Sequence, residues 1–326
     1  MIRLEVLKEN IDLSDFISQS LNGTIFQNPR FLNYHPENRF PQEQFQIQNF
    51  QFFKKNKLVA FLPGRVVTLE SGEKVYKSPF ASSYGGYVFY KKIKFSEIEE
   101  VISLTIAHLK VLGVSEMHLT PGLTCYGHEQ GEKENFVEYN LMKEGADVET
   151  VELCMVHKVS NEELTQRVDS KIRTELKHCI KYNISGEVEQ GVSKSAYDLL
   201  ESSQANFGKT PTHSFEDLQR ICELFPDKIF TFKSYHDGNL IGGIIGFKIQ
   251  EKVLNTFYIF DAPEHREYKP NHYNYHQVLT WAQNNGIEYV DFGPATFGYT
   301  PHYPLIFFKE KFDALPFLKK RYIKKL

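Results

Sequence analysis

The sequence is poor in cysteine, in net charge and in long hydrophobic runs. Its four cysteines are far apart, which argues against a disulfide framework and against a zinc site. A net charge of −3 lacks the basic excess typical of a general nucleic-acid-binding protein. No apolar run approaches the roughly 20 residues that span a bilayer, and the charged N-terminus does not resemble a signal peptide. We therefore expect a cytoplasmic protein with reduced thiols, no metal and no membrane span.

The apolar content, by contrast, is sufficient for more than one domain. The chain has 326 residues, of which 41% are hydrophobic and 14% aromatic. A single hydrophobic core rarely serves a chain of that length, so about two compact units are expected.

The most informative stretch runs from residue 230 to residue 311. Two β-rich runs, 230–235 and 240–247, flank the turn His236-Asp237-Gly238-Asn239, whose Asp-Gly pair is typical of a β-hairpin. A further strand is predicted at 253–260. Residues 273–285 carry apolar side chains at three- and four-residue steps, which predicts a helix ending before Gly286, and a short strand follows at 287–292.

A second copy of this pattern lies nearer the N-terminus. Residues 108–121 match 281–294 as helix, glycine, strand and proline, and Lys57–Ala60 matches Asn239–Gly242 in a hairpin. We infer an internal repeat, with one unit at 1–155 and a second at 156–326. Between the copies, helices are predicted at 170–182 and 193–206. Ser160 with Glu163 and Ser214 with Asp217 have the spacing of capping boxes.

Several short motifs together resemble one known group. They are Thr24 to Pro29, Tyr84-Gly85-Gly86, the basic Lys171-Ile172-Arg173 helix, Asp237 to Gly243, Gly286 to Gly293, and Phe307-Phe308-Lys309. The chain resembles the FemAB-type branch of the GCN5-related N-acyltransferase (GNAT) superfamily, including its BioF2-like acetyltransferase domains. This resemblance implies a mixed α/β fold with two tandem GNAT-like units, each a mixed sheet flanked by helices. It also implies N-acyl transfer to an amine bound in a cleft between the units.

The acyl donor implied by the resemblance is either acyl-CoA or aminoacyl-tRNA. Coenzyme A users of the superfamily place a glycine-rich loop before the main helix, where it cradles the pyrophosphate. Here that position is residues 261–271, which contain no glycine and two glutamates. This departure disfavours acetyl-CoA and suits the aminoacyl-tRNA users of the branch. Phe260, Asn271 and Phe308 are assigned to the donor side, and no permanently bound cofactor is expected.

Two residues are candidates for catalysis. Lys309 follows Phe307-Phe308, and the resemblance places it near the reacting carbonyl, where a lysine could neutralise the oxyanion. The alternative is a surface lysine among Lys311, Lys319 and Lys320. Asp291, at the end of an apolar strand, is either a base or orienting group, or a carboxylate that caps a turn.

The acceptor is expected to be a small-molecule or cell-wall-precursor amine, and the acceptor end of tRNA is a further possible partner. Tyr84, Gly85 and Gly86 could let it approach the backbone, although a simple turn is the alternative. Arg173 and Lys177 share a helix face that could bind an anionic group or be merely solvated. Asn206 could line the acceptor cleft.

Two other interpretations are weaker. His272 and His276 have the i, i+4 spacing of zinc ligands, but the glutamate of a zinc protease and a third ligand are missing. A non-catalytic binding protein on a degenerate acyltransferase scaffold is the alternative to an enzyme, and the missing phosphate loop is its best support.

Overall fold

The computed structural model describes residues 1–7, 12–34, 44–126 and 134–326. The chain divides into two compact units: Met1–Glu152 with Phe317–Leu326, and Leu153–Pro316. The sequence-based boundary lay between residues 155 and 156, and the last ten residues, which it assigned to the second unit, group with the first. In the described part of the chain, no helix is long and apolar enough to cross a bilayer.

The first unit is built on strands and two longer helices. Its elements are β1 (Ile2–Leu7), α1 (Ser14–Ser18), α2 (Pro29–Leu32), β2 (Gln44–Ile47), β3 (Asn49–Lys54), β4 (Lys57–Leu62), β5 (Arg65–Thr68), β6 (Lys74–Ser78), β7 (Val88–Phe89), α3 (Phe95–Val111), β8 (Glu116–Leu119) and α4 (Glu134–Lys143). β9 (Asp147–Lys158) leads out of this unit, and β17 (Ala314–Lys325) returns to it. The buried stripe of α3, with Ile98, Val101 and Ile102, packs into the core of this unit.

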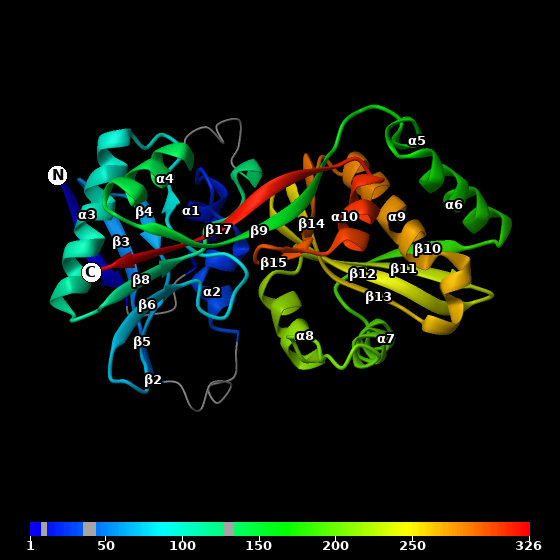
Figure 1. Cartoon of the computed structure of the whole chain (residues 1–326), viewed down its shortest axis with the longest axis horizontal. Coiled ribbons are helices and arrows are strands. Elements are labelled where there is room, and N and C mark those ends of the chain that lie inside the picture. Colours follow the sequence, from blue (N-terminus) through cyan, green and yellow to red (C-terminus); the bar gives the residue numbers. More distant parts are fainter. Residues whose placement is uncertain (8–11, 35–43, 127–133) are drawn as a thin grey trace. The chain divides into compact units, whose positions relative to one another are not determined.

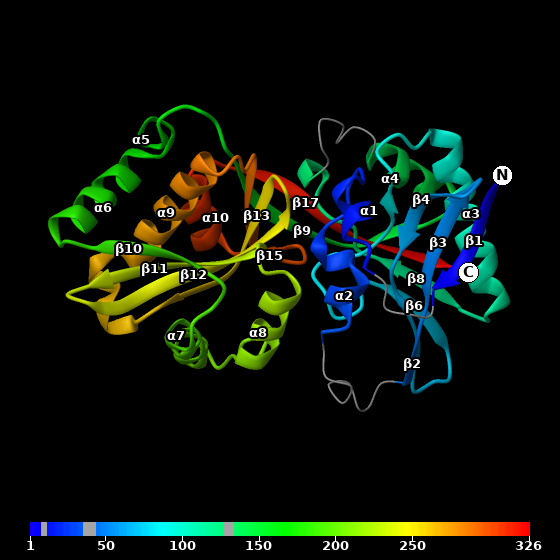
Figure 2. The same ribbon diagram turned by 180° about the vertical axis from the view of Figure 1, so that it is seen from behind.

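The second unit is a twisted sheet covered by helices on both faces. Its elements are α5 (Leu164–Arg167), α6 (Ser170–Lys181), β10 (Ser185–Gln190), α7 (Lys194–Ala205), α8 (Phe215–Leu224), β11 (Ile229–His236), β12 (Asn239–Gln250), β13 (Val253–Asp261), the 3₁₀ helix η4 (Pro263–Tyr268), α9 (Pro270–Asn284), β14 (Tyr289–Pro294), β15 (Thr296–Phe297), β16 (Thr300–Pro301) and α10 (Tyr303–Glu310). α6, α9 and α10 lie on one face of the sheet, and α7 and α8 on the other (Figures 1 and 2).

The internal repeat is visible in the strand order. The first unit has the order β17-β8-β6-β5, with β8 and β6 parallel and the other neighbours antiparallel. The second has β9-β14-β13-β12 with the same sequence of directions. The helices that precede β8 and β14 are each followed by a glycine with positive φ, Gly113 at 70° and Gly286 at 69°. The predicted architecture of two mixed-sheet units is therefore confirmed.

Local predictions were right where the pattern was strong. The hairpin joins β11 to β12 through Asp237 and Gly238, both with positive φ, as a two-residue turn of this type requires. Ser214 and Asp217 form the predicted capping box, with hydrogen bonds in both directions. α9 begins at Pro270, three residues earlier than predicted, because proline suits the first helical position.

The capping box predicted at Ser160 was wrong. The Ser160 hydroxyl accepts hydrogen bonds from the Glu162 N–H and the Arg167 guanidinium, and the Glu163 carboxylate accepts one from the Thr165 hydroxyl. The helix there is only α5, which starts after Glu163 and has no side-chain cap. Competing local hydrogen bonds took the two groups that the pattern requires.

Candidate active site

β13 and β14 run parallel and then part. Their ladder has three pairs, Val253–Tyr289 to Asn255–Asp291. Beyond that point β13 stays with β12 as far as Asp261, whereas β14 continues beside β9 as far as Pro294. Strands that separate in this way leave backbone groups and space between them, which is where a ligand can enter a sheet.

Asp291 forms hydrogen bonds to both strands at the point where they separate. Its carboxylate is fully buried and accepts hydrogen bonds from Asn255 Nδ2 at 2.7 Å and from the Gly293 N–H at 2.8 Å. The Thr256 hydroxyl donates to the Asp291 carbonyl oxygen at 3.2 Å. Asp291 thus ties β13 to β14 and fixes the irregular end of β14, where the pairing with β9 shifts register.

Lys309, on α10, binds the same end of β14. Its Nζ donates to the carbonyl oxygens of Gly293 at 3.0 Å and Pro294 at 2.9 Å, and only 2% of the residue is exposed. Burial lowers the pKa of Lys309 to about 8, although Asp291 and Cys154 act in the opposite direction. Lys309 is therefore a buried amine, not a surface lysine, and its role in catalysis stays a prediction.

A cavity of about 360 Å³ opens beside β13 beyond the point of separation. Its walls come from the end of β13, from η4 and the first turns of α9, and from α10: Ile259, Asp261, Arg266, Lys269, Pro270, Asn271, His272, Tyr275, Leu305 and Phe308. Neither Lys309 nor Asp291 lines this cavity. Tyr275, which does, contacts Phe308 and Phe292, the residues that precede Lys309 and follow Asp291, with ring centroids 5.3 and 4.7 Å apart. The volume is within the usual range for small-molecule sites.

One end of the cavity is polar. Asp261 accepts hydrogen bonds from Arg266 Nε at 3.2 and 3.1 Å, from Arg266 Nη2 at 2.9 Å and from Asn271 Nδ2 at 3.0 Å. Other lining residues, among them Tyr275 and Phe308, are apolar or aromatic. His272 also lines the cavity and is neutral at pH 7, because burial lowers its pKa to about 4.

Two of the three residues predicted on the donor side line the cavity, and one does not. Asn271 and Phe308 line the cavity. Phe260 does not, because side chains alternate along β13 and its ring packs on the opposite side, so closely that a Cβ added to Gly243 would lie 2.6 Å from it. Sequence reasoning missed Asp261, Arg266 and Tyr275, and considered His272 only as a metal ligand. A carboxylate at the end of an apolar strand, as at Asp291, was the available signal for Asp261.

The remaining candidates in this unit lie on its surface. Arg173 and Lys177 are exposed on α6, and Asn206 is exposed at the end of α7. The Arg173 guanidinium donates to the carbonyl oxygens of Val168 at 2.7 Å and Thr165 at 3.3 Å, so it already caps the end of α5. Neither His272 nor His276 belongs to a group of three metal-binding side chains within the described residues.

In the first unit, Tyr84, Gly85 and Gly86 are buried. The Gly85 N–H donates to the Thr120 carbonyl at 2.7 Å, and a Cβ at Gly85 would lie 2.3 Å from the Pro79 nitrogen. Glycine is therefore needed there for close packing. Tyr84 and Gly85 line a cavity of about 10 Å³, which has room for about one water molecule.

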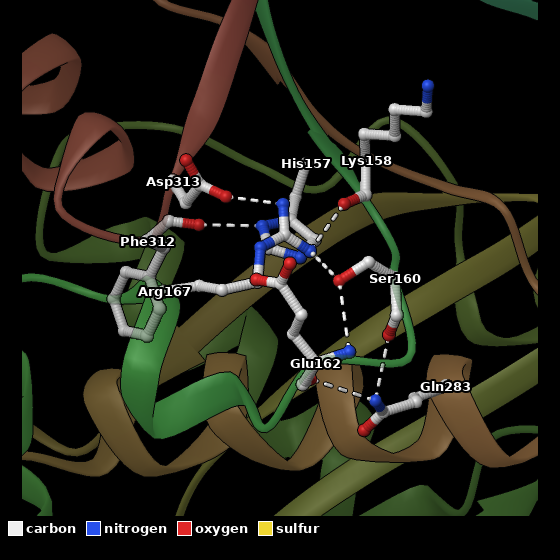
Figure 3. Close-up of polar contacts among 8 residues, drawn as sticks. All are labelled: His157, Lys158, Ser160, Glu162, Arg167, Gln283, Phe312 and Asp313. Atoms are coloured by element: carbon white, nitrogen blue, oxygen red, sulfur yellow. Dashed lines mark hydrogen bonds and ion pairs between the residues drawn. The ribbon is translucent and has the colours of Figure 1, made fainter.

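A network of polar contacts anchors the end of α10 (Figure 3). His157 Nδ1 donates to the Phe312 carbonyl at 2.7 Å, because a carbonyl can only accept. Arg167 forms an ion pair with Asp313 and donates to the Lys158 carbonyl at 2.8 Å and the Ser160 hydroxyl at 2.9 Å. These contacts join β9, α5 and the segment after α10, and thereby help to hold Lys309 and Phe308 in place.

Comparisons with known proteins identify the domain type. Residues 185–300 match the family described as an acetyltransferase (GNAT) domain. The whole chain is similar in structure to FemX, with a TM-score of 0.70, 11% identity and coverage of 96% of this chain and 94% of FemX. A search of curated proteins gives no significant match.

Two further solved structures have the same fold. One is L-PGS from Bacillus licheniformis, with a TM-score of 0.59, 12% identity and coverage of 96% and 91%. The other is a tandem GNAT protein from the clavulanic acid biosynthesis pathway, with a TM-score of 0.55, 12% identity and coverage of 100% and 98%. Identities this low speak for the fold alone.

Proposed function

Because this chain has the two-unit GNAT fold and carries a GNAT domain at 185–300, we propose that it is an N-acyltransferase whose second unit binds the acyl donor. The observation that supports this most directly is the separation of β13 from β14 after Asn255 and Asp291, with a cavity beside the freed part of β13. A donor carbonyl placed there can reach backbone N–H groups that no ladder partner uses, and the acyl chain can enter the apolar part of the cavity.

The reaction is acyl transfer to nitrogen. The lone pair of the acceptor amine attacks the donor carbonyl carbon, and the carbonyl oxygen becomes the oxyanion of a tetrahedral intermediate. Collapse of this intermediate expels the thiolate or alkoxide of the donor, which takes up the proton that the amine loses. Holding the two reactants together and stabilising the oxyanion are the contributions required of the protein.

In this proposal Lys309 stabilises the oxyanion, and Asp291 holds the end of β14 to which Lys309 is bound. An ammonium group has three N–H donors, and Lys309 uses two of them on the carbonyls of Gly293 and Pro294. The third can serve the oxyanion when the donor carbonyl enters between the strands. Asp291 holds the Gly293 N–H and so keeps both carbonyls in reach of Lys309.

The donor is acyl-CoA or aminoacyl-tRNA, and the acceptor is a small-molecule or cell-wall-precursor amine. The helix that would receive a pyrophosphate, α9, starts with Lys269 in a left-handed conformation followed by Pro270, which has no N–H to offer. This start supports an aminoacyl donor over coenzyme A. Arg173 and Lys177 on α6 are proposed to bind an anionic part of the acceptor or of tRNA, and Asn206 and the Tyr84–Gly86 segment to contact the acceptor.

Donor binding and turnover test the proposal separately. Thermal unfolding is measured with acetyl-CoA and with an aminoacylated RNA minihelix; a donor at 100 times its dissociation constant stabilises the protein by about 2.7 kcal/mol. Acyl transfer to a panel of amines and nucleotide-linked cell-wall precursors is then followed by mass spectrometry. We expect one donor to bind and to be consumed, and we expect Lys309→Ala to lose at least 100-fold in kcat, whereas Lys311→Ala, at a partly exposed lysine, keeps it. Binding without turnover of any acceptor would instead support the non-catalytic binding protein.

A further inference from the structure

The segment that precedes α9 is where coenzyme A users of the GNAT superfamily hold a pyrophosphate on backbone N–H groups. Two of the N–H groups in this segment are already used. That of His265 donates to the Ala262 carbonyl at 3.0 Å, and that of Lys269 donates to the Arg266 carbonyl at 3.1 Å. Pro270, the first residue of α9, has no N–H at all. The side chains therefore decide whether an anion is bound here.

Two side chains at this position form an arrangement that holds an anion. Arg266 donates to one and the same anion through Nε and Nη2, at 2.9 to 3.2 Å, and Asn271 donates to it through Nδ2 at 3.0 Å. A guanidinium fork of this kind matches a phosphate as well as a carboxylate. The anion that it holds in this structure is the side chain of Asp261, the last residue of β13.

The Asp261 carboxylate fills this arrangement completely. Its Oδ1 accepts hydrogen bonds from Arg266 Nε and Nη2, and its Oδ2 accepts them from Arg266 Nε and Asn271 Nδ2. These four bonds use all the acceptor positions that a carboxylate offers. Only 7% of Asp261 is exposed, and its N–H donates to the Ser203 hydroxyl at 3.3 Å. A carboxylate displaced from Arg266 would therefore stay buried without its partner, which is costly.

The other charges on the cavity wall do not supply a second anion site. Of the lining residues that the structure describes, Arg266 and Lys269 are the two cations. Lys269 lies 4.0 Å from the Glu175 carboxylate, so each cation has an acid beside it. His272 is neutral at pH 7, because burial lowers its pKa to about 4.

We infer that Asp261 determines donor specificity: its carboxylate occupies the position of a phosphate at Arg266 and Asn271 and thereby excludes donors that bind through a pyrophosphate. Coenzyme A does not fit the start of α9, because the chain fills the anion site with its own side chain. Removal of this one carboxylate should open the site to a diphosphate. The inference rests on the proposed function, because it concerns which donors enter the cavity.

Three probes test this on the full chain without any turnover: inorganic pyrophosphate, coenzyme A, and pantetheine, which lacks the phosphates. Each is titrated at pH 7, and binding is followed by NMR at the Arg266 Nε–H signal. Asp261→Ala should bind pyrophosphate and coenzyme A at least about tenfold more tightly than the wild type does, because the guanidinium fork is free to hold a phosphate. Pantetheine should bind equally to both proteins.

Three further variants assign the effect to residues. Asp261→Asn keeps the shape of the side chain and should gain affinity for pyrophosphate in the same direction, and it replaces Asp261→Ala if that variant does not fold. Glu264→Gln removes an exposed acid from η4 and controls for net charge, so its affinity should stay that of the wild type. Arg266→Gln, combined with Asp261→Ala, should abolish the gain.

The outcomes separate this inference from the enzymatic proposal. A wild type that binds pyrophosphate as tightly as Asp261→Ala would overturn the role of Asp261, and so would a gain that survives Arg266→Gln or that Glu264→Gln reproduces. If the gain is found but the chain transfers no acyl group from any donor, the role of Asp261 stands and the enzymatic proposal fails. If the wild type transfers an acyl group from coenzyme A, the enzymatic proposal stands and the role of Asp261 fails.

Discussion

Asp291→Asn tests how the separation of β13 and β14 is maintained. The Asp291 carboxylate is fully buried and receives two N–H donors, one from Asn255 at 2.7 Å and one from Gly293 at 2.8 Å. A carboxylate satisfies both, because it has two oxygens. An asparagine has one oxygen and one NH₂ group, so either orientation of its amide leaves one of the two donors facing another donor.

The expected loss follows from these contacts. A hydrogen bond to a charged group contributes about 1.5–3 kcal/mol, and the asparagine is relieved of the cost of burying a charge, so we expect Asp291→Asn to lower the free energy of unfolding by about 2 kcal/mol. Asp291→Ala leaves both donors unsatisfied and should cost about 4 kcal/mol. Because Asp291 raises the pKa of Lys309, both variants should also lower that pKa below about 8.

Urea unfolding followed by tryptophan fluorescence measures the change in the free energy of unfolding in the second unit itself. The single tryptophan, Trp281, lies on α9 in the second unit and contacts Phe230 and Phe232, with ring centroids 4.7 and 5.6 Å apart. Asp198→Asn is the matched control, because Asp198 is exposed and pairs with Lys194 one helical turn away; it should cost less than about 0.5 kcal/mol. If Asp291→Asn were as mild as the control, Asp291 would not organise this part of the sheet.

Two further predictions concern α10. Folding lowers the pKa of Lys309 from 10.5 to about 8, so between these pH values the unfolded chain binds more protons at this site than the folded chain. From pH 8 to 10.5 the free energy of unfolding of the wild type should therefore rise by up to about 3 kcal/mol relative to Lys309→Met, as measured by urea unfolding. A difference between the two proteins that does not change with pH would refute the burial of a charged lysine. Arg167→Ala should lower the free energy of unfolding by about 2 kcal/mol, because three contacts of its guanidinium are lost. The control Lys171→Ala, at an exposed residue, should leave it almost unchanged. Equal urea midpoints for the two variants would show that the network in Figure 3 does not stabilise the second unit.

The elements that could be predicted were those with a strong local cause. The Asp237-Gly238 turn needs residues that accept positive φ, and Gly113 and Gly286 end their helices in the same way. The cavity could not be predicted, because its walls come from residues 259–275 and 305–308, and it exists only where a parallel ladder stops. The hydrogen bond from Asn271 to Asp261, ten residues away, likewise follows from the fold, and no spacing rule indicates it.

The two copies of the repeat also differ at the position of the proposed donor site. In the first unit, β6 and β8 stay paired through Ser78 and Leu119, the last residues of both strands. Beyond them the Thr120 N–H donates to the Ser78 carbonyl at 2.8 Å, and the Gly85 N–H donates to the Thr120 carbonyl at 2.7 Å. These hydrogen bonds close the position at which the second unit opens between β13 and β14. The backbone groups that could hold a carbonyl are thus already used in the first copy, and we therefore expect the proposed donor site in the second unit.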